Sequence, residues 1–193
     1  MNSVLARALA PALLLTVAAC AGHDSRCAAL PGGGRYCLQP TAAVAAFEVE
    51  QKVEATFSGR RETLIASIEA DAQRLSFVGL TPFGHKLVHV VYNNQAASAI
   101  TLADQRLDPA LLLALLQLTL WPADAVRAGL TPPLTLEERP GLRRILSGDQ
   151  ALMSVSYTGA QPPYQQMRIA LPPASLDLDV QSLALPSEVE PEP

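Results

Sequence analysis

Three cysteines near the N-terminus carry the clearest chemical signal in the sequence. Cys20 directly follows Val17-Ala18-Ala19, at the point where an apolar stretch over residues 8–19 ends. Small residues just before a cysteine are typical of the cleavage site of bacterial lipoproteins, after which the cysteine is acylated. We therefore expect residues 1–19 to be a lipoprotein signal peptide and Cys20 to be lipidated. The alternative is an ordinary signal peptide that happens to have a cysteine near its end.

The residue after Cys20 indicates where such a lipoprotein goes. Position 21 is Ala, and no Asp stands there to retain the protein in the inner membrane. An acylated cysteine carries enough buried methylene to anchor a chain stably. We expect a chain anchored by lipid at the periplasmic face of the outer membrane.

The other two cysteines, Cys27 and Cys37, flank the flexible segment Pro31-Gly32-Gly33-Gly34. An even pair in an exported chain favours a disulfide. The competing interpretation is a metal-binding pair, but only the lone His23 lies nearby. We expect a disulfide and no metal site.

Other residues that could do chemistry do not form a catalytic pattern. There is no Gly-x-Ser-x-Gly, no phosphate-binding glycine loop and no His-Glu-x-x-His. His85 and His89 share one face of a strand but lie about 13 Å apart, too far for one metal ion. Glu48, Glu50 and Glu54 accompany Lys52 on what reads as a solvated strand face. We expect no enzyme activity and no cofactor.

Composition narrows the class of protein further. The 193 residues carry a formal charge of −4, which becomes −5 once Arg7 is lost with the signal peptide. Aromatic residues make up 5% of the chain and hydrophobic residues 49%. A nucleic-acid partner is excluded because its phosphates need a basic face and its bases need stacking partners. The apolar fraction is enough for one substantial core.

Alternating apolar and polar residues predict most of the fold as strands. In residues 47–57, one face holds Phe47, Val49, Gln51, Val53, Ala55 and Phe57. That period of two is typical of a half-buried strand. The same pattern and the intervening turn residues predict further strands over residues 61–70, 74–80, 85–92, 97–102, 142–146, 151–158, 164–171 and 176–185. The proline-containing segment 130–141 is expected to be a loop.

The period changes in the middle of the chain. Asp108-Pro109 is a favourable helix start, and residues 110–120 are apolar nearly all round until Pro122 ends the segment. Such a helix is buried against the sheet or covers a cavity. We expect Leu112, Leu115, Leu116 and Trp121 to form this lid or line the cavity, although closing the core is the other role open to Trp121. A second short helix is expected over residues 123–128.

These elements define the expected architecture. The fold class is mainly β with inserted helices (α+β), in which a curved antiparallel sheet forms an incomplete barrel with a helical lid. The domains are a signal peptide (1–19), a lipidated tether with a small stapled loop (20–44), a half-barrel (45–185) and a disordered acidic tail (186–193).

The order of these elements, together with Thr81-Pro82-Phe83-Gly84 and Trp121-Pro122, resembles the LolB-like outer-membrane lipoproteins. It looks closer still to an uncharacterised bacterial lipoprotein family that is related to LolB and LolA and accompanies aryl-polyene-type biosynthesis clusters. The resemblance covers residues 45–185, and its specific parts are residues 75–90 and 111–130. It implies a LolA/LolB-like half-barrel that handles acyl chains.

The resemblance also implies a role for one loop. In LolB, an Asn-Pro-Leu-Gly loop projects an apolar side chain that helps to insert cargo into the membrane. Pro82, Phe83 and Gly84 match it here, with Thr81 in place of Asn and Phe83 in place of Leu. A projecting Phe83 would probe the membrane or the cargo; the alternative is that Phe83 folds back onto the sheet.

The sequence is consistent with two classes of function. The first is an acyl-chain carrier that transfers or inserts a lipoprotein, lipid or polyene lipid at the outer membrane, with a periplasmic carrier protein as a further partner. The second is a non-catalytic assembly lipoprotein that binds a protein through a sheet edge.

Overall fold

The structure is a computed structural model, and it describes residues 25–183. The signal peptide, Cys20 and the acidic tail 186–193 lie outside the described residues. Within them, one continuous core cluster runs from Ala28 to Val180. The described fold therefore makes a single unit.

The described residues form twelve strands, two α-helices and two short 3-10 helices. The strands are β1 (Cys27–Ala29), β2 (Arg35–Cys37), β3 (Phe47–Phe57), β4 (Arg60–Ala70), β5 (Leu75–Leu80), β6 (Lys86–Tyr92), β7 (Ala97–Leu102), β8 (Leu134–Arg139), β9 (Leu142–Ser147), β10 (Gln150–Thr158), β11 (Gln166–Leu171) and β12 (Leu176–Leu183). The helices are α1 (Pro109–Leu120) and α2 (Ala123–Gly129), with 3-10 turns at Thr41–Ala43 and Pro172–Ala174.

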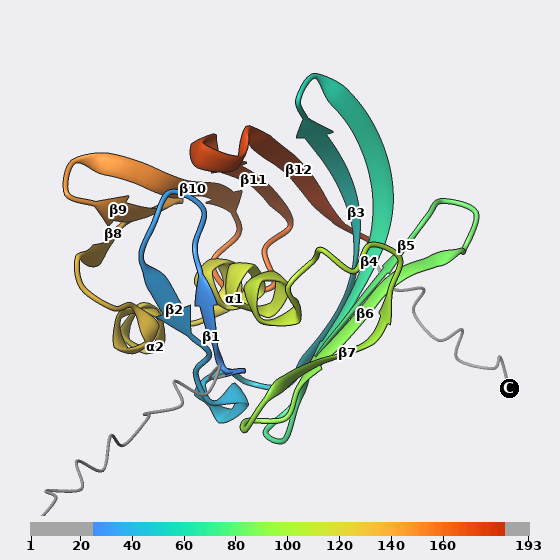
Figure 1. Ribbon diagram of the computed structural model, residues 1–193, viewed down its shortest axis with the longest axis horizontal. Coiled ribbons are helices and arrows are strands. Elements are labelled where there is room, and N and C mark those ends of the chain that lie inside the picture. Colours follow the sequence, from blue (N-terminus) through green and yellow to red (C-terminus); the bar gives the residue numbers. More distant parts are fainter. Residues whose placement is uncertain (1–24, 184–193) are drawn as a thin grey trace, which may run out of the picture.

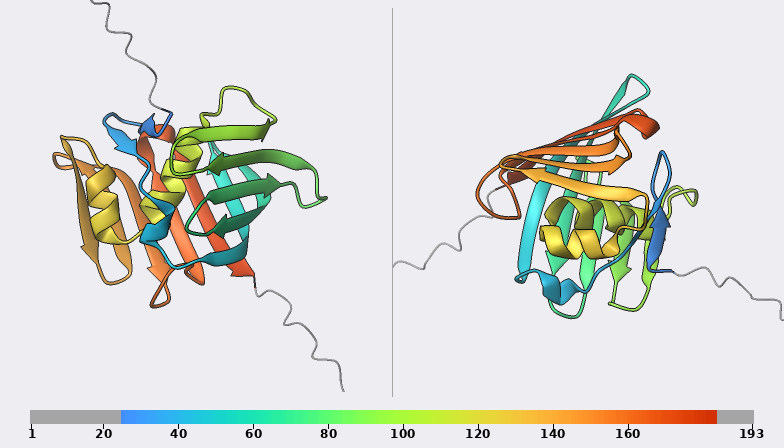
Figure 2. Two further views of the ribbon diagram at one scale, coloured as in Figure 1. Left: turned by 90° about the horizontal axis from the view of Figure 1, so that it is seen from below. Right: turned by 90° about the vertical axis from the view of Figure 1, so that its left-hand side faces the viewer.

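Ten of the strands make one antiparallel sheet, in the order β7-β6-β5-β4-β3-β12-β11-β10-β9-β8. The sheet bends so that its two halves lie on different sides of α1 (Figures 1 and 2). Its end strands, β7 and β8, do not pair with each other, so the barrel is not closed. The expected mainly β class with inserted helices is confirmed.

The longest hairpin shows why the sequence folds in this way. Strands β3 and β4 pair over eleven residues, with Val49 opposite Ile68 and Val53 opposite Leu64. Both residues of the turn between them have positive φ, 49° at Ser58 and 78° at Gly59. This turn geometry matches the natural twist of paired strands. The period-two pattern thus places its apolar set on the face toward α1.

Helix α1 lies within the curve of the sheet. The side chain of Asp108 accepts a hydrogen bond from the backbone N–H of Ala110 at 2.9 Å, as a capping residue does. One side of α1 is fully buried through Leu113, Ala114 and Leu118. Its other side faces the inner surface of the sheet, where packing is incomplete.

Residues before the expected domain boundary at 45 belong to the core. Cys27 and Cys37 form a disulfide with an S–S distance of 2.06 Å, which joins β1 to β2. Tyr36 on β2 is fully buried, and its hydroxyl donates to Gln117 Oε1 of α1 at 3.1 Å. Burial raises the pKa of Tyr36 well above its usual value. The small stapled loop therefore packs against α1 and acts as more than a tether.

The segment expected to be a loop, residues 130–141, contains strand β8. Leu134 and Leu136 alternate there with polar residues, and the pair Pro132-Pro133 ends just before the strand begins. Glu138 lies opposite Arg143 in the pairing of β8 with β9. The prolines favoured a loop, but β8 forms a hairpin with the next strand, β9. The sheet consequently has one strand more than the nine expected.

A buried arginine fixes the C-terminal end of α1 to this part of the sheet. Arg143 on β9 is 3% exposed. Its Nη1 donates to the carbonyl oxygens of Leu118, Thr119 and Trp121 at 2.8–3.3 Å, and Nη2 donates to Glu138 Oε1 at 2.8 Å. The guanidinium thus satisfies carbonyls that a helix end leaves without partners.

Neither α1 nor α2, the α-helices described between residues 25 and 183, is both long and apolar enough to cross a bilayer.

Candidate functional site

An apolar cavity of about 450 Å³ lies between α1 and the inner face of the sheet. It is surrounded by residues of β3–β6, β10–β12, the loop after β7 and α1. These residues are Gln51, Val53, Ala55, Leu64, Ala66, Ile68, Phe77, Gly79, Leu87, Val88, Ala103, Asp104, Leu107, Leu112, Leu115, Leu116, Thr119, Leu120, Met153, Met167, Ile169, Leu171, Leu176, Leu178 and Val180.

The cavity opens at one end of the strands. Ala55, Leu64 and Leu176 lie near that end and remain partly exposed, and Leu107 is 41% exposed. We call these four residues the mouth. Apolar side chains that line a hollow and still meet solvent leave unburied area that a ligand can cover.

The opposite end of the strands is tied together by polar contacts. Nδ2 of Asn94 donates to the carbonyls of Ala72 and Gln73 at 3.1 Å, and its Oδ1 accepts from the backbone N–H of Thr41 at 2.7 Å. Ser25 also lies at this end, because its carbonyl accepts from the N–H of Ala97 at 3.1 Å. The chain therefore enters the fold at the end opposite the mouth.

Three of the lining residues are polar. The hydroxyl of Thr119 donates a hydrogen bond to the carbonyl oxygen of Leu115 at 2.8 Å. Gln51 is 3% exposed and donates from Nε2 to Ser182 Oγ at 3.1 Å. Asp104 is the one ionisable residue in the lining and forms an ion pair with Arg106 at 2.6 Å. Hydrogen bonds from Arg106 lower the pKa of Asp104 to about 2, so it stays ionised.

The structure separates the residues expected to form the lid. Leu112, Leu115 and Leu116 all line the cavity, on the side of α1 that faces the sheet. Trp121 does not line it: its side chain is fully buried in the core, and its Nε1–H donates to the carbonyl of Pro40 at 3.2 Å. The expected place of Trp121 among the cavity residues is therefore corrected. Trp121 is the C-cap of α1, which ends at Leu120, and its indole reaches the N-terminal segment at Pro40.

The loop between β5 and β6 projects from the sheet. Phe83 is 89% exposed, so the alternative in which it folds back does not hold in this structure. The N–H of Gly84 donates to the carbonyl of Thr81 at 2.9 Å, and Gly84 has a φ of 83° that suits glycine. Pro82 and Gly84 thus hold Phe83 at the tip of a tight turn, at the same end of the strands as the mouth.

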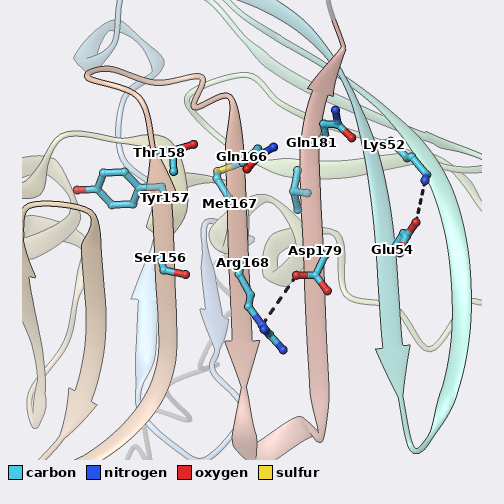
Figure 3. Close-up of a pocket in the computed structure, with 11 residues that line it drawn as sticks. Lys52, Glu54, Ser156, Tyr157, Thr158, Gln166, Met167, Arg168, Asp179 and Gln181 are labelled. Carbon is cyan, nitrogen blue, oxygen red and sulfur yellow. Dashed lines mark hydrogen bonds and ion pairs between the residues drawn. The ribbon is translucent and has the colours of Figure 1, made fainter.

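A second hollow of about 420 Å³ lies on the outer face of the sheet, over β3, β12, β11 and β10 (Figure 3). Its charged side chains pair with one another: Lys52 with Glu54 at 2.7 Å and Arg168 with Asp179 at 3.8 Å. Their exposed fractions run from 36% to 67%. This is the solvated face expected around Lys52, and its charges already have partners.

Among residues 25–183, no group of three or more His, Cys, Asp or Glu side chains is arranged to hold a metal ion. His85 is exposed just before β6. His89 lies 3.4 Å from Ser76 Oγ, and burial, with help from Lys86 and Arg74, lowers its pKa. The described part of the chain offers the cavity, and no cluster of reactive groups, as its candidate site.

Sequence reasoning missed two polar residues that matter. Gln51 stood in the apolar face of its strand, and that position was the signal that it points inward. Arg143 stood in an expected strand with no sign of burial, because its partners are the backbone carbonyls at the end of α1.

The curved open sheet, the helix within it and the apolar cavity define a mainly β protein with an interior hollow beside a central helix. The chain belongs to the family described as protein of unknown function (DUF3261), whose model matches residues 48–184. No curated protein has a sequence that matches this chain.

Proposed function

We propose that the protein is a lipoprotein anchored in the outer membrane, which binds an acyl chain in the cavity and helps to transfer or insert a lipidated or lipid-like cargo. The observation that carries the proposal is the cavity itself. Of its lining side chains, only Gln51, Thr119 and Asp104 are polar. When an apolar chain leaves water and covers apolar surface of this kind, the free energy of the system falls.

The magnitudes suit an acyl chain. A volume of 450 Å³ holds about fifteen methylene groups, if each takes about the 30 Å³ of a water molecule. Each buried methylene contributes about 0.8 kcal/mol. Transfer needs no bond chemistry, because a difference in affinity between cavity and bilayer moves the chain. The proposal therefore includes no catalytic step and no cofactor.

We further propose that the protein has a LolA/LolB-like fold and transfers its cargo as LolB and LolA do. Phe83 supports it, because an aromatic side chain that is 89% exposed at the same end of the strands as the mouth can contact a cargo chain or a lipid surface. The cargo classes are a lipoprotein, a lipid or a polyene lipid, handed over by a periplasmic carrier protein. The anchor is the acylated Cys20.

The direct test is to identify what the cavity holds. The chain from residue 21 onward is exported behind a cleavable signal and purified without detergent; this removes none of the contacts described for residues 25–183. Mass spectrometry of an organic extract should find a stoichiometric amphiphile. A protein that is empty and also takes up no fluorescent fatty acid would contradict the proposal.

A matched pair of variants shows whether binding occurs in the cavity. Ala55→Phe places a ring in the mouth, where Ala55 lines the cavity. Ala99→Phe adds the same ring at an exposed position of β7 that does not line it. Uptake of the fatty acid should fall in Ala55→Phe and stay unchanged in Ala99→Phe. Equal effects would mean that the chain binds elsewhere.

The alternative function is an assembly lipoprotein that binds a protein partner at a sheet edge. Strand β7 favours it, because this edge strand has no charged residue and its Ile100 is 64% exposed. This alternative becomes the working hypothesis if the cavity takes up no lipid.

A further inference from the structure

Gln51 is a polar group near the inner end of the cavity. It lies on β3 four residues before Ala55 of the mouth, and both side chains face the cavity. Four strand residues span about 13 Å. Gln51 pairs across the sheet with Ser182, at the end of the strands away from the mouth. A chain that enters at the mouth therefore meets Gln51 with its leading end.

The orientation of the Gln51 amide follows from its neighbours. Ser182 Oγ donates its hydrogen to the carbonyl of Tyr164 at 2.7 Å. The Ser182 oxygen can then only accept, so the Gln51 group that faces it at 3.1 Å has to be Nε2. Oε1 is turned away from Ser182, and no residue from 25 to 183 donates a hydrogen bond to it.

Gln51 is 3% exposed, but its Oε1 is not sealed off and meets the open space of the cavity. An apolar chain that covered Oε1 would leave this acceptor without a partner, which is costly. A ligand group that donates a hydrogen bond removes that cost. Thr119 offers the ligand no donor from its hydroxyl, because that hydrogen is held by Leu115. A hydroxyl fits Gln51 best, since it donates to Oε1 and can accept the remaining Nε2 hydrogen.

Charge decides which end of the ligand enters. No Lys, Arg or His is among the described residues that line the cavity, and Asp104 is an anion already paired with Arg106. A carboxylate or phosphate buried without a cationic partner is strongly disfavoured. A charged head group therefore remains at the mouth, and the neutral end of the chain goes in first.

We propose that the cavity is specific for an apolar chain whose buried end carries a neutral hydrogen-bond donor, a hydroxyl, which is accepted by Oε1 of Gln51. This inference rests on the proposed binding of an apolar chain in the same cavity. It adds the polarity of the chain's inner end and names the residue that selects it.

The test compares two ligands that differ in one group. The chain from residue 21 onward is titrated with the methyl ester of a long-chain fatty acid and with the same ester carrying a hydroxyl at its far end. Affinity is read from displacement of a fluorescent fatty acid. We expect the hydroxylated ester to bind roughly five- to ten-fold more tightly, as one buried hydrogen bond allows. Equal or weaker binding of the hydroxylated ester would overturn the inference and leave the proposed function standing.

Variants assign the preference to Gln51. Gln51→Leu keeps the size of the side chain and should abolish the difference between the two esters. Gln181→Leu is the matched control, because Gln181 is an exposed glutamine on the outer face of β12 and should leave the difference intact. A preference that survives in a folded Gln51→Leu would overturn the assignment.

A spectroscopic readout separates this role from a structural one and needs no variant. The side-chain amide signals of Gln51 in ¹⁵N NMR should shift with the hydroxylated ester and much less with the plain ester. Binding of both esters with no difference at Gln51 would overturn the inference. If neither ester bound, the proposed function would fail and the inference with it.

Discussion

At the scale of single residues, Arg143 is the one charged residue that is buried among residues 25–183. Its guanidinium is held by three carbonyls of the α1 terminus and by Glu138. We expect Arg143→Met to lower the free energy of unfolding by roughly 3–5 kcal/mol, because it leaves Glu138 and the carbonyls without their partner. Urea denaturation of the wild type and the variant measures this difference in the free energy of unfolding.

The neighbouring Arg144 supplies the control for this prediction. Its side chain is 45% exposed and lies 3.5 Å from Glu137. An exposed ion pair contributes at most about 1 kcal/mol. Arg144→Met should therefore change stability little, and a loss equal to that of Arg143→Met would refute the special role of the buried guanidinium.

Phe83 should matter for function and not for stability. Because its side chain is 89% exposed, Phe83→Glu should change the free energy of unfolding by less than about 0.5 kcal/mol. It should abolish release of a bound fluorescent fatty acid to lipid vesicles, since a charge replaces the apolar tip. Ile100→Glu, at another exposed apolar position, should leave release unchanged. Normal release by Phe83→Glu would count against the loop's role.

The ionisation of Asp104 predicts how the stability of the fold depends on pH. Hydrogen bonds from Arg106 lower the pKa of Asp104 from its ordinary 3.8 to about 2. The folded state thus holds this proton less tightly than the unfolded state does. Its contribution to stability is complete above about pH 4 and is lost as the pH falls toward 2. NMR titration of the carboxyl should show a midpoint near 2, and Arg106→Gln should move it upward. A midpoint unchanged by Arg106→Gln would contradict this cause.

At the scale of elements, the two sides of α1 should respond differently to truncation. Leu113 is fully buried, so Leu113→Ala should cost roughly 2–5 kcal/mol in thermal or urea unfolding. Leu116 is partly exposed in the cavity, so Leu116→Ala should cost less stability and should weaken fatty-acid binding instead. Equal stability losses would indicate that the cavity is closed in solution.

Most elements were predictable because their signals are local. The alternation in residues 47–57 predicted β3 and its inner face, and Asp108-Pro109 and Pro122 predicted the limits of α1. Strand β8, which forms a hairpin with β9, was missed because the two prolines before it favour a loop. Strands β1 and β2 were missed because they are held by the disulfide and by burial of Tyr36.

The candidate site was only partly predictable for a related reason. Leu112, Leu115 and Leu116 face the cavity as expected, since a helix apolar all round must place some leucines toward the sheet. Trp121 is buried in the core and does not line the cavity, because it follows the last turn of α1 and has an extended backbone. The exposure of Phe83 depends on the shape of the hairpin, which the sequence left open.

At the scale of the whole molecule, a sheet that stays open has two ends with unpaired backbone groups, and these ends differ chemically. At β8, three charged residues discourage another strand. At β7, the sequence Ala-Ser-Ala-Ile-Thr-Leu has no charge and no proline. The sheet can therefore be extended at one end much more readily than at the other. Concentrated protein should self-associate through β7, and Ile100→Lys should keep it monomeric in sedimentation, whereas Leu136→Lys on β8 should not. At high concentration such molecules would join edge to edge in pairs and go no further, because each offers a single receptive strand.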